Sequence, residues 1–254
     1  MNQTAPLSGR NVLISGGSRH LGEAIARRFA ALGASLAINH WQDGEKAEQL
    51  VRDLKQQGTE AVALEADVGK SDQVRQLVAQ AVGAIGSIDV LIHCAGPFAM
   101  SPFIRMAESE WDTILNVNLK GAYLLSKELA PAMKARGWGR IILMSAGSAF
   151  IRTHSIYGLA KSSIIHLTES LAIELGPEVT VNAIAPGQIQ ESAEIMDTYE
   201  PGFSARATAG APLKKLVTRP EVAEMMALIC TSPAMASVTG HTFVMDGGWR
   251  LTAA

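Results

Sequence analysis

The chain has few of the residues from which disulfide frameworks and metal sites are built. Its 254 residues include two cysteines, Cys94 and Cys230. Two are too few for a disulfide framework or a zinc site made of thiolates. The six histidines are scattered, without the His-x-x-x-His spacing that places two ligands on one helix face. We therefore expect no metal site, and both cysteines are interpreted as small buried apolar residues.

The sequence also lacks long apolar runs and an excess of basic charge. No stretch approaches the roughly 20 apolar residues that span a bilayer, and the first ten residues, MNQTAPLSGR, lack the apolar core of a signal peptide. The formal net charge is -2, whereas nucleic acids and anionic membranes call for a basic face. We expect a cytoplasmic protein whose partner is a small molecule, with no nucleic acid and no membrane.

Short apolar runs alternate with longer amphipathic segments along the chain. The expected strands are Asn11–Ser15, Ala34–Ile38, Ala61–Leu64, Val90–Ile92, Arg140–Met144, Val179–Ile184 and Thr242–Met245. The expected helices are Leu21–Leu32, Glu45–Gln57, Ser71–Ile85, Glu108–Ala135, Ser155–Leu175 and Pro220–Cys230. Strands that are apolar throughout are buried on both faces, as in a parallel sheet covered by helices. The pattern predicts an α/β fold, a doubly wound parallel sheet of about seven strands with helices on both faces.

Nothing in the sequence divides the chain into parts. We find no linker, repeat or low-complexity run, so residues 1–254 are expected to form a single domain. The least regular stretch is 188–218, which is rich in Gly, Ala, Pro and Glu. Loops of that length in a compact domain tend to be lids or binding loops.

A glycine-rich turn, Ser15-Gly16-Gly17-Ser18-Arg19-His20-Leu21-Gly22, lies between the first strand and the first helix. Glycines let the backbone approach a ligand closely. The helix start offers free N–H groups and a positive dipole end to a phosphate. The spacing is not G-x-G-x-x-G, and a plain tight turn is the alternative. Its place in the first β-α unit favours a nucleotide.

The residues after the second strand indicate which nicotinamide cofactor is used. That strand ends in Asn39-His40-Trp41, without an acid at its last residue. An Asp or Glu there would bind a ribose 2′-hydroxyl and repel a 2′-phosphate. With Arg19 nearby, we expect NADP(H) to be preferred over NAD(H), although Asp43 weakens this argument.

Tyr157 and Lys161 stand four residues apart on an expected helix, so they share a face. A neighbouring ammonium is expected to lower the pKa of a phenol from its usual value of about 10. Such a tyrosine can donate a proton to a carbonyl oxygen, or accept it back. A packed tyrosine beside an exposed lysine is the alternative for this pair alone.

Further motifs follow in a fixed order along the chain. Each lies near the end of an expected strand or inside a helix: Asp67-Val68, His93-Cys94-Ala95-Gly96, Asn118, Ser145, Asn182 to Gly187, and Val244 to Gly248. In this joint order the chain resembles the short-chain dehydrogenase/reductase family over nearly its whole length. The resemblance implies a Rossmann-type fold and hydride transfer between a nicotinamide and a carbonyl or alcohol.

The resemblance also assigns roles to individual residues. Tyr157 would be the catalytic acid/base, Lys161 would bind the nicotinamide ribose, and Asn118 would hold a water in a proton relay. The cofactor would be bound by Gly16, Ser18, Arg19, His20, Leu21, Gly22, Asn39, His40, Asp67, Val68, Ala95, Gly96, Tyr157, Lys161, Pro186, Gly187 and Ile189. The stretch 188–218 would be the loop that covers the substrate.

The chain departs from the family pattern at several positions. His20 stands where the turn usually has its middle glycine, and a basic residue there resembles the pteridine reductases, which use NADPH. His93 and Cys94 replace two asparagines, and Glu191 replaces a threonine that usually contacts the cofactor.

The catalytic serine has three candidates. Ser145 lies one residue short of the usual spacing before Tyr157, Ala146 falls on the family position when counted from Gly139, and Ser148 is the third. We favour Ser145, because a hydroxyl is needed to orient the carbonyl beside Tyr157. His154 and Ser155 could border the substrate pocket, and Ser155 is also placed to cap its helix.

The expected function is NADP(H)-dependent reduction of a carbonyl, with 3-oxoacyl thioesters as the first substrate class. The alternative is a catalytically weak or inactive nucleotide-binding sensor or scaffold on the same fold, which the unclear serine keeps open. The resemblance also implies a homotetramer whose interfaces use the helices at 108–135 and 155–175.

Overall fold

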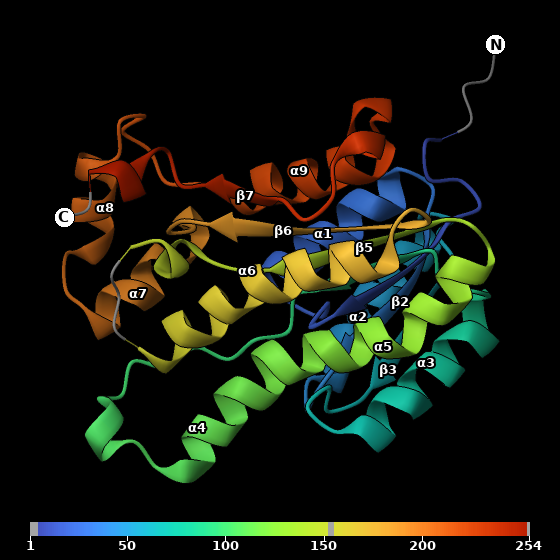
Figure 1. Cartoon of the computed structure of the whole chain (residues 1–254), viewed down its shortest axis with the longest axis horizontal. Helices are drawn as coiled ribbons and strands as arrows, with labels where there is room; N and C mark the ends of the chain where they lie inside the picture. Colours follow the sequence, from blue (N-terminus) through green and yellow to red (C-terminus); the bar gives the residue numbers. More distant parts are fainter. Residues whose placement is uncertain (1–4, 152–154, 253–254) are drawn as a thin grey trace.

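The computed structural model describes residues 5–151 and 155–252. Within them, seven parallel strands form one sheet in the order β3-β2-β1-β4-β5-β6-β7 (Figure 1). The strands are β1 (Asn11–Ser15), β2 (Ser35–His40), β3 (Ala61–Glu65), β4 (Val90–His93), β5 (Gly139–Met144), β6 (Val179–Pro186) and β7 (Thr242–Met245). The strand order reverses between β1 and β4, where α/β sheets of this kind bind ligands at the carboxyl edge.

Helices follow the strands, as the alternating pattern predicts. They are α1 (His20–Ala31), α2 (Gly44–Gln56), α3 (Ser71–Ile85), α4 (Glu108–Leu115), α5 (Gly121–Ala135), α6 (Ile156–Leu175), α7 (Ala193–Tyr199), α8 (Phe203–Gly210) and α9 (Arg219–Thr231). Parallel neighbours need such crossovers because a tight turn cannot connect them. The expected Rossmann-type doubly wound sheet is confirmed.

The two faces of the sheet carry separate apolar cores. Val12 and Ile14 of β1 pack with α1, α2 and α9 on one face. Leu13 points the other way and packs with α3, α5 and α6. In Figure 1, α3, α5 and α6 run side by side across one face. Because successive strand residues alternate in direction, one apolar strand supplies both cores.

Two helix starts are fixed by side chains that the sequence places there. Ser155 caps α6, since its hydroxyl accepts a hydrogen bond from the Gly158 N–H at 3.0 Å. Thr218 and Glu221 form a reciprocal capping box at the start of α9. The expected capping role of Ser155 is thereby confirmed, whereas His154 lies outside the described residues.

The expected continuous helix at 108–135 is interrupted. A π-helical turn, η2 (Asn116–Lys120), separates α4 from α5. The turn buries Asn118, whose side-chain NH₂ donates to the Ile114 and Pro97 carbonyls at 2.9 and 3.0 Å. Turns of this kind recur at functional sites, and apolar periodicity alone could not reveal this one.

The stretch 188–218, here called the covering segment, is more regular than its composition indicates. It contains the short helix η4 (Gln190–Ser192) and the α-helices α7 and α8, which gather beyond the carboxyl ends of β6 and β7 (Figure 1). Its ends are tied together by a parallel bridge between Ile189 and Val217. No helix in the described residues is long and apolar enough to cross a membrane.

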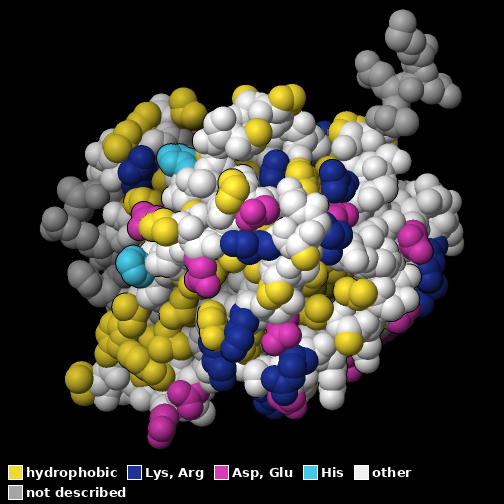
Figure 2. Space-filling view, turned by 45° about the vertical axis from the view of Figure 1, so that its right-hand side comes forward, with side chains coloured by type: hydrophobic (Ala, Val, Ile, Leu, Met, Phe, Trp, Pro, Cys, Tyr) yellow, Lys and Arg dark blue, Asp and Glu magenta, His cyan; other side chains and the backbone are white. Residues whose placement is uncertain are grey.

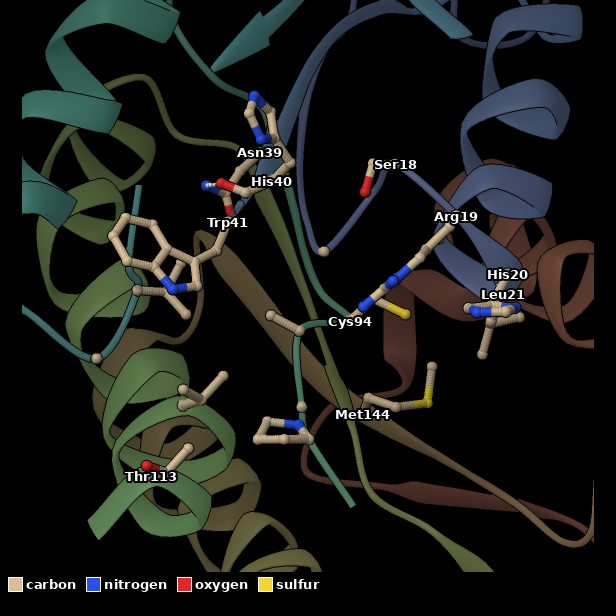
Figure 3. A pocket seen from close by; sticks show the side chains of 18 of the residues that line it. Ser18, Arg19, His20, Leu21, Asn39, His40, Trp41, Cys94, Thr113 and Met144 are labelled. Atoms are coloured by element: carbon tan, nitrogen blue, oxygen red, sulfur yellow. Dashed lines mark hydrogen bonds between the residues drawn. The ribbon is translucent and has the colours of Figure 1, made fainter. Parts of the chain in front are cut away.

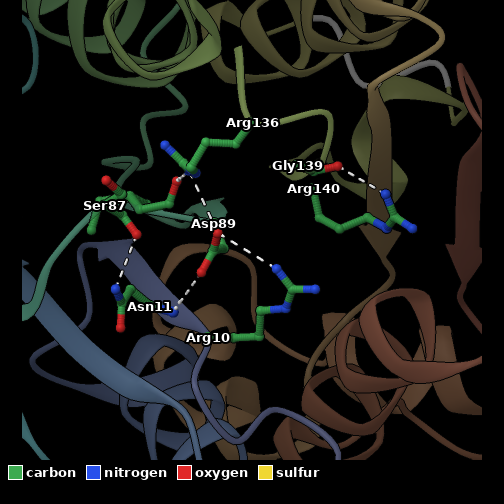
Figure 4. Close-up of polar contacts among 8 residues, drawn as sticks. Arg10, Asn11, Ser87, Asp89, Arg136, Gly139 and Arg140 are labelled. Atoms are coloured by element: carbon green, nitrogen blue, oxygen red, sulfur yellow. Dashed lines mark hydrogen bonds and ion pairs between the residues drawn. The ribbon is translucent and has the colours of Figure 1, made fainter. Parts of the chain in front are cut away.

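The opposite edge of the sheet is held by a buried carboxylate. Asp89 is 8 % exposed, and its oxygens accept from the Asn11 N–H at 3.1 Å and from Arg136 at 3.4 Å (Figure 4). Arg10 lies 3.7 Å from the same carboxylate. This contact joins residues at the starts of β1 and β4 to the end of α5.

We expect Asp89→Asn to lower the free energy of unfolding by about 1–3 kcal/mol, because it leaves buried hydrogen-bond donors without a charged acceptor. Turnover per folded molecule should stay unchanged, since Asp89 lies at the edge of the sheet away from the carboxyl ends. Urea denaturation measures the first effect. Glu48→Gln on the exposed face of α2 is the control, with an expected change within about 0.5 kcal/mol. Equal stability of the two variants would contradict this account of Asp89.

Candidate active site

A cavity of 710 Å³ opens at the carboxyl ends of the strands, around the point where the strand order reverses. Every residue predicted to bind the cofactor lines this cavity, from Gly16 of the glycine-rich turn to Ile189 after β6. Ser145, Tyr157 and Lys161 also line it, while Asn118 lies fully buried behind Gly96. The topology thus brings together side chains that are far apart in the sequence.

The glycine-rich turn allows a backbone approach that a side chain would block. Gly16 has φ +64°, and a Cβ there would lie 2.7 Å from the Ala95 Cα. A Cβ on Gly22 would lie 2.1 Å from the Gly16 carbonyl oxygen. The turn therefore packs directly against the residues after β4 and leaves the first N–H groups of α1 at the cavity. N–H groups at a helix start of this kind can bind a phosphate.

The end of the cavity beside the start of α1 contains a cation, Arg19, and an acid, Asp43. Figure 3 shows Arg19 extending from the start of α1 into the space near Cys94 and Met144. The Ser18 hydroxyl donates to Asp43 at 2.8 Å, and the Arg19 Nε lies 3.7 Å from the same carboxylate oxygen. Asp43 therefore lines the cavity and holds both the Ser18 hydroxyl and the Arg19 guanidinium.

His40 supplies a further polar group at this end. It is 6 % exposed, lines the cavity, and its Nδ1 has no hydrogen-bond partner among the described residues. The side-chain NH₂ of Asn39 is already hydrogen-bonded to the protein. It donates to the Ala66 carbonyl at 3.0 Å and to the His40 carbonyl at 3.1 Å. Because the His40 Nδ1 is buried, His40 lines the cavity without presenting this nitrogen to a ligand.

Tyr157 and Lys161 lie together on the first turns of α6. The Lys161 ammonium lies 5.4 Å from the centre of the Tyr157 ring and donates to the Met144 carbonyl at 2.8 Å. Lys161 is 2 % exposed. Burial lowers the pKa of its ammonium to about 8, while the Cys94 thiol opposes this shift. No carboxylate is bonded to this ammonium in the described residues.

The pKa of Tyr157 moves in the opposite direction to the one that the sequence predicts. We expected the Lys161 ammonium to lower the pKa of the Tyr157 hydroxyl, but burial raises it well above its ordinary value, and Cys94 adds to this. Desolvation disfavours the charged phenolate form. Tyr157 is therefore protonated at neutral pH, which suits a group that donates a proton to a carbonyl oxygen.

Asn118 points its side-chain oxygen toward Lys161. A Cβ on Gly96 would lie 2.2 Å from the Asn118 Oδ1 and 3.2 Å from the Lys161 Nζ. The Oδ1 is buried and has no hydrogen-bond partner in the described parts of the chain. An acceptor and an ammonium that face the same small space can hold a polar group between them.

His93 takes over the place where an asparagine was expected. Its Nδ1 lies 2.8 Å from the Ser15 hydroxyl and its Nε2 lies 3.3 Å from the Asn118 carbonyl. Burial, followed by the charge of Lys161, lowers the pKa of His93 to about 3, so the ring is neutral. These two contacts connect the end of β1 to the π-helical turn through the His93 ring.

The three candidate positions for the family serine, 145, 146 and 148, differ in their surroundings. The Ser145 hydroxyl donates to the Lys161 carbonyl at 2.8 Å and is 1 % exposed. Ala146 lines the cavity beside it. Ser148 lies in η3 (Gly147–Ala149), and its buried Oγ has no partner among the described residues. The hydroxyl of Ser145 is thus bonded to the backbone of α6 in this structure.

Aromatic side chains border Tyr157 on the substrate side. Phe98 meets Tyr157 edge to face with ring centres 5.0 Å apart, and Tyr199 of α7 meets Phe98 at 5.6 Å. The covering segment thereby brings an aromatic ring close to the proposed acid. These edge-to-face contacts surround one side of the Tyr157 ring with aromatic side chains.

Sequence reasoning missed some residues that line the cavity. Thr113 of α4 and Lys70 before α3 are the clearest cases. Thr113 precedes Val117 by one helical turn, so it shares a face with a residue beside Asn118. That spacing was the available signal. The described residues contain no group of three or more His, Cys, Asp or Glu side chains that could hold a metal ion.

Comparison with known proteins decides the family. The family model described as "Enoyl-(Acyl carrier protein) reductase" matches residues 16–250. A 3-oxoacyl-(acyl-carrier-protein) reductase of Staphylococcus epidermidis is 31% identical over 242 residues, which cover 94% of this chain and 98% of that protein. Dehydrogenase/reductase SDR family member 4 of Bos taurus is 32% identical, with 98% and 90% covered. The chain belongs to the short-chain dehydrogenase/reductase family.

Solved structures agree with this family membership. A blue fluorescent protein from a metagenomic library, in complex with NADPH, has a TM-score of 0.86 at 30% identity, with 96% of this chain and 99% of that chain covered. A short-chain dehydrogenase/reductase of Brucella melitensis, described as glucose/ribitol dehydrogenase, has a TM-score of 0.85 at 28% identity, with 97% and 99% covered. As a member of this family, the chain is an NAD(P)-dependent oxidoreductase that acts on a small molecule.

We expect Lys161→Met to lower turnover by at least about 100-fold, while the free energy of unfolding at pH 7 stays equal or rises by up to about 3 kcal/mol. The folded-state pKa of Lys161 is lowered, so the cost of burying its charge is complete below pH 8. This cost disappears as the pH rises toward the unfolded value of about 10.5.

Denaturation at pH 7 and at pH 10 measures this difference, and the relative stability of the variant should fall at the higher pH. Lys55→Met on the exposed face of α2 is the control and should show no such pH dependence. A variant that is several kcal/mol less stable at pH 7 would show that the buried ammonium stabilises the fold.

Proposed function

We propose that the chain is an NADP(H)-dependent carbonyl reductase whose substrates are of the 3-oxoacyl thioester type. The observation that carries the proposal is the placement of a protonated Tyr157 beside the buried Lys161 ammonium, at a cavity that the glycine-rich turn lines. The relatives named 3-oxoacyl-(acyl-carrier-protein) reductases, at 31% and 32% identity, support the substrate class.

The chemistry follows from the positions of these groups. The bound nicotinamide supplies the hydride to the carbonyl carbon. The Tyr157 hydroxyl donates its proton to the carbonyl oxygen, since its raised pKa keeps the proton available. The Lys161 ammonium stabilises negative charge that develops on the tyrosine oxygen. Asn118 Oδ1, which faces the same space as the Lys161 Nζ, would hold a water that returns the proton.

We assign Ser145 to this machinery through Lys161. Its hydroxyl bond to the Lys161 carbonyl holds the turn of α6 that presents the ammonium. A direct contact with the substrate oxygen would require this hydrogen bond to open. Ala146, which lines the cavity, offers no hydroxyl. This arrangement is the specific observation that favours the second candidate, a catalytically weak nucleotide-binding sensor or scaffold.

The cofactor preference rests on Arg19 at the adenosine end. Its guanidinium would bind the 2′-phosphate, and the cavity residues Asp67, Val68, Ala95 and Gly96 would hold the adenosine. Pro186, Gly187 and Ile189 would lie against the nicotinamide. The relative solved with NADPH supports this preference. Asp43 opposes it, because its carboxylate is bonded to Ser18 and pairs with Arg19.

We also propose a homotetramer. Exposed apolar side chains lie on η1 (Phe103–Arg105), α4, α5 and α6, including Ile104 at 98%, Trp111 at 38% and Tyr123 at 44% exposure. Figure 2 shows apolar side chains gathered at the lower left, on the side of α4. Large exposed apolar patches of this kind mark protein–protein contacts, and these helices are the ones that the resemblance assigns to subunit interfaces.

We expect NADPH to bind at least about ten-fold more tightly than NADH, because one charge-assisted phosphate contact contributes about 1.5–3 kcal/mol. Arg19→Gln should remove most of this preference, and Asp43→Asn should increase it by freeing Ser18 and Arg19. Fluorescence titration of both dinucleotides measures the ratio. Arg27→Gln, an ion-paired arginine on the outer side of α1, should leave it unchanged. If Asp43→Asn weakened NADPH binding, the carboxylate would be a ligand for the cofactor.

We expect Tyr157→Phe to lower carbonyl reduction by about 100-fold or more, the usual effect of removing a general acid. NADPH affinity should stay within about three-fold, because the ring remains in place against Phe98. NADPH oxidation with a panel of 3-oxoacyl thioesters and simple ketones measures both. Ser145→Ala should have a smaller effect than Tyr157→Phe, since Ser145 acts through Lys161.

An unimpaired Tyr157→Phe variant would overturn the mechanism. Tight binding of NADPH by the wild type without turnover of any carbonyl would favour the sensor. In that case Ala146→Ser tests whether a missing hydroxyl is the cause.

A further inference from the structure

A contact between His20 and Arg219 joins two ends of the chain at the rim of the cavity. The Arg219 Nη2 lies 3.2 Å from the His20 Nδ1, across 199 residues of sequence. His20 is the first residue of α1 and lines the cavity, and Arg219 is the first residue of α9. In Figure 3, His20 and Arg19 both extend from the start of α1 at one side of the cavity.

This contact fixes which nitrogen of His20 carries the hydrogen. A guanidinium N–H can only donate, so the Nδ1 of His20 accepts and the Nε2 holds the ring hydrogen. Burial lowers the pKa of His20, and the positive charges of Arg219, Arg19 and Lys46 add to this against the opposite effect of Asp43. The ring is therefore a neutral donor through Nε2 at the N-terminal end of α1.

The same arginine holds the start of the covering segment. Its Nη2 donates to the Glu191 carbonyl at 3.2 Å and to the Ser192 hydroxyl at 3.3 Å. Its backbone N–H donates to the Glu191 carboxylate at 3.1 and 3.2 Å. Glu191 is thus turned to the start of α9, where a negative charge is favourable. Its carboxylate does not stand free at the cavity.

The backbone conformation of His20 adds a second observation. Its φ of +53° lies in the left-handed region that favours glycine. A non-glycine residue in this region costs about 1 kcal/mol or more, and such strain is concentrated at functional sites. The strained conformation keeps the ring at the rim of the cavity beside the N–H groups of α1, where the glycine-rich turn leaves room for a phosphate.

We propose that His20 and Arg219 form a clamp for the diphosphate of the dinucleotide, in which His20 binds the diphosphate and Arg219 is a positioning residue that holds His20 and the covering segment together. The inference rests on the proposed dinucleotide-binding function. In this clamp, the position of the covering segment and the binding of the diphosphate both depend on Arg219. The adenosine end of the cofactor lies outside the clamp.

The test compares a ligand that has the diphosphate with one that lacks it. Dissociation constants of NADPH and of adenosine 2′-monophosphate, which has no 5′-phosphate, are measured by calorimetry on the full chain, for the wild type, Arg219→Gln, His20→Gly and the double variant. We expect each single variant to weaken NADPH binding by about ten-fold, the equivalent of one charge-assisted hydrogen bond. Binding of adenosine 2′-monophosphate should stay within about two-fold. The double variant should be little worse than either single variant, because the two residues act as one unit.

Two variants separate a binding role from a structural one. His20→Gly relieves the positive φ and should be at least as stable as the wild type, so weaker NADPH binding by this variant cannot reflect unfolding. Arg28→Gln removes another ion pair between α1 and α9, that of Arg28 with Glu224, and should change neither affinity. The clamp is overturned if both ligands weaken equally in Arg219→Gln, or if NADPH affinity is unchanged in His20→Gly.

Failure of the proposed function gives a different result. If the wild type binds neither NADPH nor adenosine 2′-monophosphate, the cofactor assignment is wrong and the clamp is overturned with it. If the wild type binds only NADH, the NADP(H) preference is wrong. The clamp is then tested with NADH against adenosine, since both dinucleotides contain the diphosphate.

Discussion

The site depends on an ammonium that is buried without a carboxylate. Lys161 is 2 % exposed, and its hydrogen bond within the described residues is to a backbone carbonyl. A charge in such surroundings has a lowered pKa, near 8 here, because water no longer stabilises it. The neutral His93, the protonated Tyr157 and the side-chain oxygen of Asn118 are all arranged around this charge. Each provides dipoles or acceptors and none provides a full negative charge, so the ammonium remains available for negative charge that develops during the reaction.

Three departures from the family pattern are each matched by a new contact. His93 replaces an asparagine and connects Ser15 to the Asn118 carbonyl. Glu191 replaces a threonine and caps the start of α9. His20 replaces a glycine and meets Arg219. His93 is buried, whereas His20 and Glu191 are exposed, and in each case a partner from another element satisfies the new polar group. The fold keeps its geometry while the chemistry at the cofactor side of the cavity changes.

Stability and chemistry are separated at the two edges of the sheet. The edge with the strand starts is held by Asp89 and its arginines, which satisfy a buried carboxylate. Buried polar atoms without a partner in the described residues lie near both edges: His40 Nδ1 and Asn118 Oδ1 near the carboxyl edge, Arg140 Nε and Glu178 Oε2 near the strand starts. What distinguishes the carboxyl edge is the cavity that opens there. The covering segment closes over this edge and brings Tyr199 toward Phe98 and Tyr157.

The sequence alone determined the elements and their order, because apolar periodicity and turn chemistry are local properties. Strands such as Asn11–Ser15 and helices such as Ser71–Ile85 follow from them residue by residue. The resemblance to the family also named most of the residues that line the cavity, although Thr113 and Lys70 were missed. The tertiary structure alone decided the rest. The direction of the Ser145 hydroxyl, the raised pKa of Tyr157 and the contact of His20 with Arg219 all depend on groups that approach from distant parts of the chain. Burial and hydrogen-bond geometry arise only when the elements pack, so no local pattern in the sequence could specify them.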